Sequence, residues 1–388
     1  MTDKPSISDA LRLRQWALHA LVGVLDTPPA SGLASWQIFL RMERCASQLK
    51  ARLVAQGLFE QLRPHAQEQL SATARRELQK VLCVRAQLRL LDEIAARHGW
   101  TVVVLKGAVA ALRDSTAVDL GDLDILVPPQ EAQALAAALE DVGYRASGGS
   151  NQRHLKGRVA EGELEIEIHT VTDAADPAWS GSVWNRLIPV DGTSRSRQLA
   201  PPDHLWHVLT HVVVYHRFRS GAIRDLLLIR DAVAACCENE LGEVSDRIES
   251  HQHADALRDV LWTAVQLRGN KAFVDRYVSQ AAVLYYLDWQ ANRLALPQVL
   301  RGDVGSWAFS LLQPKTQLRH SWDNIWTESL GRSQSPLIAR LEQKAPLLGR
   351  VMRVASRMGR AAMAMVYAVP LAVMASFVAR RATRSLAR

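Results

Sequence analysis

The spacing of hydrophobic residues predicts helices along nearly all of residues 8–98. Apolar residues recur three or four positions apart, which places them on one face of a helix. From Gln67 to His98 the pattern is long and one face is charged, while the other carries Leu78, Val81, Leu88, Leu91 and Ile94. The pattern stops at Gly99-Trp100, so we expect an N-terminal helical segment over residues 1–98.

Strand patterns replace the helical ones after this point. Residues 101–105 form a β-branched run, and residues 123–127 form a second apolar run of strand length. Residues 164–169 (LEIEIH) alternate apolar and polar side chains, as in a strand with one charged face. Short helical patterns lie between them at residues 108–113 and 131–142. This alternation predicts a small mixed sheet with helices packed against it.

Helical periodicity returns after Pro201. The predicted helices cover residues 203–217, 221–238, 253–267 and 274–291. The sequence therefore predicts an α+β fold in which a small mixed sheet is flanked by N-terminal helices and a C-terminal helical region. We expect four parts, namely 1–98, a catalytic domain at 99–200, a helical domain at 201–296, and an irregular or helical region at 297–388.

The net charge of +8 is concentrated at the end of the chain. Residues 345–388 contain eight arginines and no acidic residue, which leaves 47 − 8 = 39 basic residues against 39 acidic residues elsewhere. A neutral body argues against a general polyanion-binding surface, so nucleic acid is not an expected partner. The four cysteines form no CxxC pair, and no leader pattern precedes the first helix, so we expect a cytoplasmic protein without structural zinc.

The tail of the chain contains an uncharged stretch, residues 361–379, with arginines on both sides. As a helix these nineteen residues would extend ~28 Å, close to the thickness of a bilayer core, but Pro370 lies at the centre. Three interpretations are open: a helix docked on the body, a peripheral helix that binds anionic lipid, and a membrane span. The tail thus suggests a possible membrane association.

Two carboxylates stand two residues apart on one predicted strand, Asp122 and Asp124. Side chains at this spacing share a face, and paired carboxylates repel unless a cation lies between them. Oxygen ligands of this kind suit Mg²⁺ or Mn²⁺. Glu165 and Glu167 share a face of the next acidic strand, so three or four carboxylates converge if the two strands pair. The alternative interpretation is the solvated face of an edge strand.

A Lys-Gly turn, Lys106-Gly107, follows the first strand and precedes a helix. Glycine lets the backbone approach a phosphate, and the N–H groups at the start of a helix favour anions. Lys106 either reaches a phosphate oxygen or forms an ion pair with Asp124 or Glu167. Further along, His204, His207 and His211 follow helical spacing and suggest either a metal site or, more simply, a polar face packed against the sheet domain.

The segments Val104–Gly107, Gly121–Val127 and Ile166–His169 together resemble the polymerase-β-like nucleotidyltransferase superfamily, and more specifically its uncharacterised bacterial branch. His207, His211 and His216, followed by Arg224-Asp225-Leu226, resemble the histidine-rich helices of that branch. The resemblance covers roughly residues 85–235. It departs from the branch where an Arg often precedes the Gly-Asp pair, because Val118, Asp119 and Leu120 stand there.

The resemblance implies an enzyme that moves a nucleoside monophosphate, AMP from ATP, to an acceptor hydroxyl and releases pyrophosphate. It implies that Asp122 and Asp124 bind Mg²⁺ or Mn²⁺, that Glu167 completes the metal site and helps to activate the hydroxyl, and that Gly107 contacts the β/γ-phosphates. The acceptor expected for a neutral body is a small molecule, a sugar or a protein side chain. The alternative is a module of the same fold that binds a nucleotide or a partner without catalysis.

Overall fold

The computed structural model describes residues 6–24, 26–113, 119–146, 154–158, 163–172, 177–215 and 222–266, together with 281, 285–286 and 372–377. The chain divides into two compact units. The first comprises residues 13–274 with 1–4, and the second comprises residues 275–388 with 5–12. The sheet, the candidate site and the helices described below from Leu33 onward all belong to the first unit.

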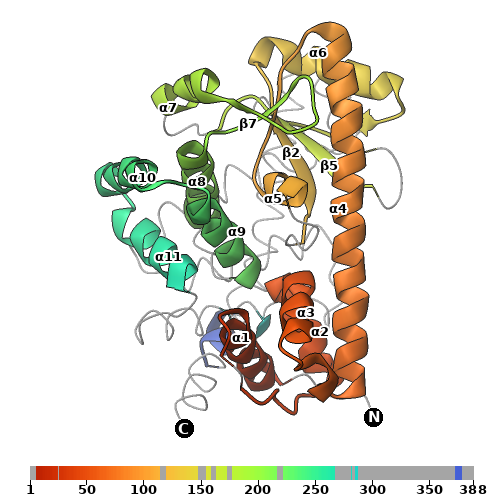
Figure 1. Cartoon of the computed structure of the whole chain (residues 1–388), viewed down its shortest axis with the longest axis vertical. Helices are drawn as coiled ribbons and strands as arrows, with labels where there is room; N and C mark the ends of the chain where they lie inside the picture. Colours follow the sequence, from red (N-terminus) through yellow and green to blue (C-terminus); the bar gives the residue numbers. More distant parts are fainter. Residues whose placement is uncertain are drawn as a thin grey trace, which may run out of the picture. The chain divides into compact units, whose positions relative to one another are not determined.

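The N-terminal part is helical, as the hydrophobic spacing predicts (Figure 1). The helices are α1 (Ile7–Leu21), α2 (Leu33–Glu43), α3 (Ala46–Ala55), a 3₁₀ turn η1 (Phe59–Gln61) and α4 (Pro64–His98). α4 begins with a proline, whose φ suits a first helical turn, and is followed by Gly99 in the left-handed conformation at φ 75°. Its buried Glu77 accepts hydrogen bonds from the backbone N–H groups of Ala46 and Ser47, which fastens the start of α3 to it.

Seven strands form one mixed sheet in the order β3-β4-β5-β2-β1-β7-β6 within the described residues. The three predicted strands are β1 (Val102–Val104), β2 (Asp122–Leu126) and β5 (Glu165–His169). β2 lies at the centre, antiparallel to β1 and parallel to β5. The α+β fold class is therefore confirmed, and the interpretation of β2 as an edge strand is wrong.

The sequence pattern did not predict the other four strands. These are β3 (Arg145–Ala146), β4 (His154–Arg158), β6 (Ile188–Pro189) and β7 (Ser196–Gln198). They are short or polar, so they carry no hydrophobic alternation. β7 pairs in parallel with β1, and its approach is held by Asp92 of α4, which accepts hydrogen bonds from the backbone N–H groups of residues 194–196. Tertiary contacts thus extend the sheet beyond the predicted strands.

One face of the sheet packs on helices, with a continuous hydrophobic core. The core combines apolar side chains of α4, including Val81, Leu88 and Leu91, with Leu123 and Ile125 of β2. It also includes residues of α5 (Gly107–Arg113) and α6 (Pro129–Asp141), which follow β1 and β2 in the chain. Because the side chains of successive residues in a strand point to opposite faces, the polar side chains of β5 point away from this core.

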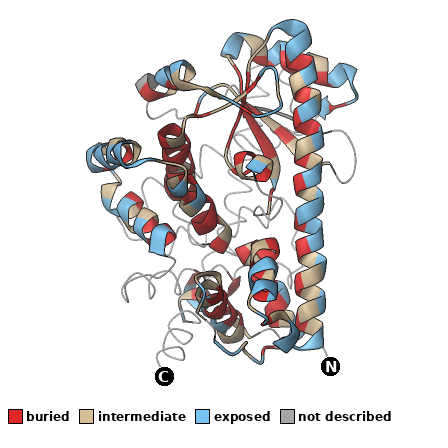
Figure 2. Ribbon diagram, viewed as in Figure 1, coloured by how far each residue is buried: buried red, intermediate tan, exposed pale blue. Residues whose placement is uncertain are grey.

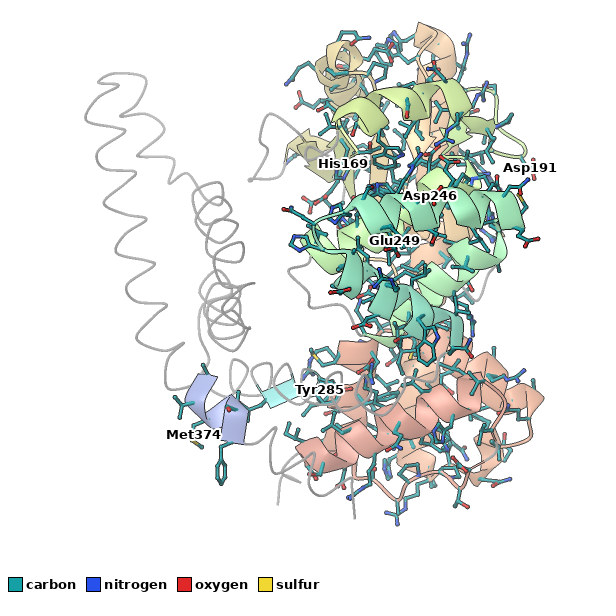
Figure 3. All side chains as sticks on the ribbon, turned by 90° about the vertical axis from the view of Figure 1, so that its left-hand side faces the viewer. His169, Asp191, Asp246, Glu249, Tyr285 and Met374 are labelled. Atoms are coloured by element: carbon teal, nitrogen blue, oxygen red, sulfur yellow. The ribbon has the colours of Figure 1, made fainter. Side chains whose placement is uncertain are left out.

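The helices α7 (Pro177–Ser182) and η2 (Val183–Arg186) lie between β5 and β6 in the chain. After β7 the chain is helical again. The later helices are α8 (Pro201–Thr210), which continues as a π-turn η3 (His211–Tyr215), α9 (Ile223–Ala234), α10 (Glu238–Ser250) and α11 (Ala254–Gln266). Figure 2 shows that α8 is buried along most of its length, whereas α10 exposes Asp246 and Glu249 (Figure 3) and buries Val244 and Ile248.

The sequence pattern missed α10 and extended its predecessor to residue 238. Cys237 is the N-cap residue, in place of the usual Ser or Thr. Its backbone N–H donates a hydrogen bond to the Glu240 carboxylate, which completes a capping box. The chain therefore stops one helix and starts another where the hydrophobic pattern alone predicts continuity.

Most of the predicted helix 274–291 and of the apolar tail 361–379 lies outside the described residues. Residues 281, 285–286 and 372–377 are helical. None of the helices in the described part of the chain combines the length and apolar character needed to cross a bilayer.

Candidate functional site

The two acidic strands lie next to each other in parallel register. Asp122 is paired with Glu165, Asp124 with Glu167, and Leu126 with His169. Residues at alternate positions of a strand share a face, so this register aligns two rows of polar side chains. The predicted convergence of carboxylates requires the second acidic strand to pair with the first. The register of β2 and β5 meets this condition.

Asp124 is the most enclosed of these carboxylates, with a side chain only 5% exposed. Its Oδ1 accepts hydrogen bonds from Lys106 Nζ at 2.8 Å and from His169 Nε2 at 2.7 Å. Burial opposes the charged form, but the Lys106 charge and the His169 hydrogen bond outweigh it and hold the pKa of Asp124 well below its usual range. An ionised carboxylate only accepts hydrogen bonds, so Nε2 of His169 carries the proton in this contact.

Three ligand groups, from Asp124, Glu167 and His169, lie within 4.8 Å of one another. His169 Nε2 is also 3.6 Å from Glu167 Oε2. Although burial favours the neutral ring, the hydrogen bonds to Asp124 and Glu167 raise the pKa of His169. His169 was not among the predicted site residues. The signal for it was present, since the alternation that places Glu165 and Glu167 on one face places His169 there too.

Asp122 lies beside this group on β2. Burial and the neighbouring charge of Asp124 raise the pKa of Asp122 to about 6, and the charge of Glu167 acts in the same direction. A nearby cation relieves such repulsion between carboxylates. The structure therefore brings Asp122, Asp124 and Glu167 together, as the sequence predicts, and leaves Glu165 half-buried opposite Asp122.

The turn at Lys106-Gly107 contains one residue with a left-handed backbone. Lys106, not the glycine, has the left-handed backbone, with φ 52°. A Cβ at position 107 would lie 2.7 Å from Leu120 Cδ2, so the Leu120 side chain would have to shift to admit one. Of the two roles considered for Lys106, the ion pair with Asp124 is the one observed.

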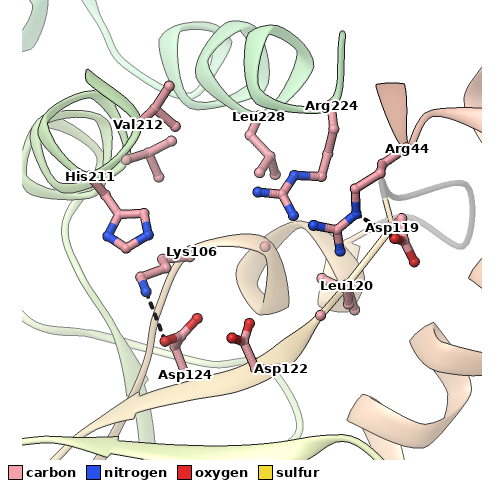
Figure 4. Close-up of a pocket in the computed structure, with 13 residues that line it drawn as sticks. Arg44, Lys106, Asp119, Leu120, Asp122, Asp124, His211, Val212, Arg224 and Leu228 are labelled. Atoms are coloured by element: carbon pink, nitrogen blue, oxygen red, sulfur yellow. Dashed lines mark hydrogen bonds and ion pairs between the residues drawn. The ribbon is translucent and has the colours of Figure 1, made fainter. Parts of the chain in front are cut away.

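A pocket of about 180 Å³ opens beside these groups (Figure 4). Lys106, Gly107, Asp122 and Asp124 line it from the sheet side. The opposite wall is lined by side chains of the later helices, Val208, His211, Val212 and Leu228. Two arginines, Arg44 and Arg224, complete the lining. Arg44 was absent from the sequence-based analysis, and Arg224 was noted there only as a feature of the family resemblance.

The helical histidines do not form a metal cluster among the described residues. His204 and His207 are buried on α8, and burial lowers the pKa of His204 to about 4 and that of His207 well below its ordinary value. His211, one turn further, lines the pocket. The simpler interpretation, a helix face packed against the sheet domain, is the one observed for His204 and His207.

A family model described as "Uncharacterised nucleotidyltransferase" matches residues 36–269, which is more than half of the chain. Comparison with curated proteins and with solved structures finds no match. The matched range contains the whole sheet, the acidic groups of β2 and β5, and both arginines of the pocket. The chain belongs to this family of uncharacterised nucleotidyltransferases.

Proposed function

We propose that the protein transfers a nucleoside monophosphate, AMP from ATP, to an acceptor hydroxyl and releases pyrophosphate in a reaction that depends on Mg²⁺ or Mn²⁺. The observation that carries this proposal is the parallel register of β2 and β5, which brings Glu167 beside Asp122 and Asp124, the two carboxylates that line the pocket. The family assignment supports the same class of reaction and favours it over binding without catalysis.

The donor set fits a divalent cation. Asp122, Asp124 and Glu167 offer carboxylate oxygens, which Mg²⁺ and Mn²⁺ prefer. Burial, and then the charge of Asp124, raise the pKa of Asp122, and a cation bound beside the carboxylates would favour the ionised form. Imidazole is a softer ligand, so we assign His169 to orienting Asp124 through its 2.7 Å hydrogen bond rather than to the ion itself. When bound, the metal would neutralise charge that develops on the phosphoryl oxygens.

The side chains of the pocket suit an in-line displacement at the α-phosphorus. The acceptor oxygen forms a bond to that phosphorus while the bond to the oxygen bridging to the β-phosphate breaks, and pyrophosphate carries the electron pair away. Glu167 accepts the proton of the acceptor hydroxyl in this proposal, since its carboxylate is part of the cluster and lies beside the pocket carboxylates of β2. Gly107 and Lys106 line the same pocket, and we propose that they contact the phosphates of the donor.

The proposed class of acceptor follows from the charge balance of the chain, which argues against nucleic acid. A body with equal numbers of acidic and basic residues does not attract nucleic acid over a broad surface. We therefore propose a hydroxyl on a small molecule, a sugar or a protein side chain.

The test is pyrophosphate release from each of the four NTPs with Mg²⁺ or Mn²⁺, across a panel of acceptors that includes the protein itself. We expect the Asp122→Asn/Asp124→Asn variant to lose at least ~10³-fold in turnover, because it removes two charges at the reacting centre. Asp141→Asn, at the exposed end of α6, is the matched control and should behave as wild type. Equal turnover in wild type and the double variant would refute the proposal.

A further inference from the structure

Two guanidinium groups face the same pocket as the carboxylates, although they come from distant parts of the chain. Arg44 follows the last residue of α2, and Arg224 lies in the first turn of α9. Both line the pocket together with Asp122 and Asp124. Figure 4 shows the two guanidinium groups turned toward each other above Asp122. The pocket thus has an acidic side on the sheet and a basic side on the helices.

Arg44 is held in place by several contacts. It has a left-handed backbone, φ 52°, as the C-cap of α2, a conformation that is unfavourable for a residue other than glycine. Its Nε donates to Asp119 Oδ2 at 2.6 Å, and Lys80 Nζ donates to the other oxygen at 2.6 Å. Although burial opposes the charged form, these two cations lower the pKa of Asp119. Asp119 therefore stays ionised and fixes the direction of the Arg44 side chain.

Gly121 gives Arg44 room beside the acidic strand. A Cβ at position 121 would lie 3.3 Å from Arg44 Nη2, which is closer than such contacts normally come. The glycine directly before Asp122 thus allows the guanidinium to approach the start of β2. An alanine at this position would require the guanidinium to shift by a few tenths of an ångström, without removing its charge.

Arg224 is largely buried, with a side chain 16% exposed. Its Nε and Nη2 both donate to Asp225 Oδ1, at 2.9 and 2.8 Å. Burial favours the neutral form, but the charge of Asp225 and the hydrogen bond to it raise the pKa of Arg224, with Asp119 and Asp122 acting in the same direction. Asp225 thus occupies one edge of the guanidinium, and Figure 4 shows that the group extends into the pocket.

Asp119 pairs with Nε of Arg44, and Asp225 pairs with Nε and Nη2 of Arg224, so each carboxylate engages only part of a guanidinium that carries five N–H donors. Arginine presents a planar fork of N–H donors that matches the oxygens of a phosphate. We infer that Arg44 and Arg224 form a clamp for the β- and γ-phosphates of the donor nucleotide, and that this clamp directs the α-phosphate toward Asp122 and Asp124. The inference rests on the proposed function for the identity of the ligand, but the anion site itself rests on the two arginines and the pocket.

The clamp makes the helices before the sheet part of the substrate site. Arg44 belongs to the chain segment that precedes β1, and Lys80 on α4 supports it through Asp119. The ligand class is a polyphosphate with at least two linked phosphates beyond the one that reacts. A nucleoside monophosphate lacks these groups and should not sense the arginines.

The experiment measures the binding of three probes by calorimetry with Mg²⁺ present, namely ATP, AMP and inorganic tripolyphosphate. The variants are Arg44→Gln and Arg224→Gln, with Arg75→Gln, an exposed position of α4, as the matched control. We expect each clamp variant to weaken ATP and tripolyphosphate binding about 10- to 100-fold, the usual effect of losing charge-assisted hydrogen bonds. AMP binding should change less than about threefold.

Gly121→Ala keeps both charges and crowds the guanidinium of Arg44, so it provides a second variant at that arginine if Arg44→Gln does not fold. It should weaken tripolyphosphate binding while the melting temperature stays near that of wild type. Unchanged tripolyphosphate binding in folded Arg44→Gln and Gly121→Ala proteins would overturn the clamp, and so would an equal loss of ATP and AMP binding.

The outcomes for the clamp and for the proposed function are separable. If wild type releases pyrophosphate and the clamp variants keep its KM for ATP, the clamp is wrong and the transferase stands. If wild type binds tripolyphosphate through the two arginines but releases no pyrophosphate with any NTP and acceptor, the clamp stands and the proposed reaction is wrong.

Discussion

The acidic and basic sides of the pocket are built in different ways. Asp122, Asp124 and Glu167 lie on two neighbouring strands, and their common direction follows from strand pleating and from one register. Arg44 and Arg224 belong to two helices, one before and one after the sheet in the chain. No local pattern links the arginines, and only the packing of those helices brings them together. Residues that share an extended element can therefore be found by spacing, whereas residues on separately packed elements cannot.

The largest effect is expected on the acidic side, from a comparison of the two glutamates of β5. Glu167→Gln should lower turnover by about 10²- to 10⁴-fold, because it removes the proposed proton acceptor and one metal ligand. Glu165→Gln, on the same face but opposite Asp122, should change turnover by less than about threefold. The measurement is kcat for pyrophosphate release. A reversed order of the two variants would show that the metal lies nearer the start of the strands.

A smaller effect is expected on the basic side, from the support of Arg44. Asp119→Asn removes the charge that holds Arg44 and Lys80, so the guanidinium should become less well ordered. We expect KM for ATP to rise about 3- to 10-fold with little change in kcat, since the lost interaction serves binding rather than the chemical step. Steady-state kinetics test this, with Asp141→Asn as the control. A fall in kcat at constant KM would assign Asp119 to the chemistry instead.

The smallest effect on activity is expected from Asp92, which belongs to neither side of the pocket. Hydrogen bonds from the backbone N–H groups of Ser194, Arg195 and Ser196 outweigh its partial burial and lower the pKa of Asp92 from 3.8 to about 2. A lowered folded-state pKa means that the stabilisation is present above pH ~4 and is lost as the pH falls toward 2. Asp92→Asn should thus lower the free energy of unfolding by about 1–2 kcal/mol at pH 7 and by much less near pH 2.

Urea denaturation at pH 7 and near pH 2.5 measures this difference, and turnover at pH 7 reports on the pocket. The loss of stability in Asp92→Asn should be clearly larger at pH 7 than near pH 2.5, and the two proteins should have the same turnover per folded molecule. An equal loss of stability at both pH values would mean that the ionised carboxylate does not stabilise the β7 connection.

The comparison also shows how much of the site was predictable. The strands that carry the acids, the turn at Lys106-Gly107 and the long helix α4 all follow from hydrophobic period and turn chemistry. The same alternation included His169, which the interpretation passed over. By contrast, no sequence pattern contains the closeness of Leu120 to position 107, where a Cβ would lie 2.7 Å from Leu120 Cδ2. The boundary between α9 and α10 depends on a Cys cap that propensity rules do not favour.

By itself, the sequence determined the strands β1, β2 and β5, most of the helices, and which acidic side chains share a face, because these properties depend on periods of a few residues. The tertiary structure decided which strands are neighbours and that Lys106 pairs with Asp124. It also decided that Asp119 accepts a hydrogen bond from Arg44, the C-cap of α2. Asp119 is one of the residues that stand where the resembling branch often has an arginine. Such contacts arise from the docking of elements far apart in the chain, and that docking depends on the whole core rather than on any local run of residues.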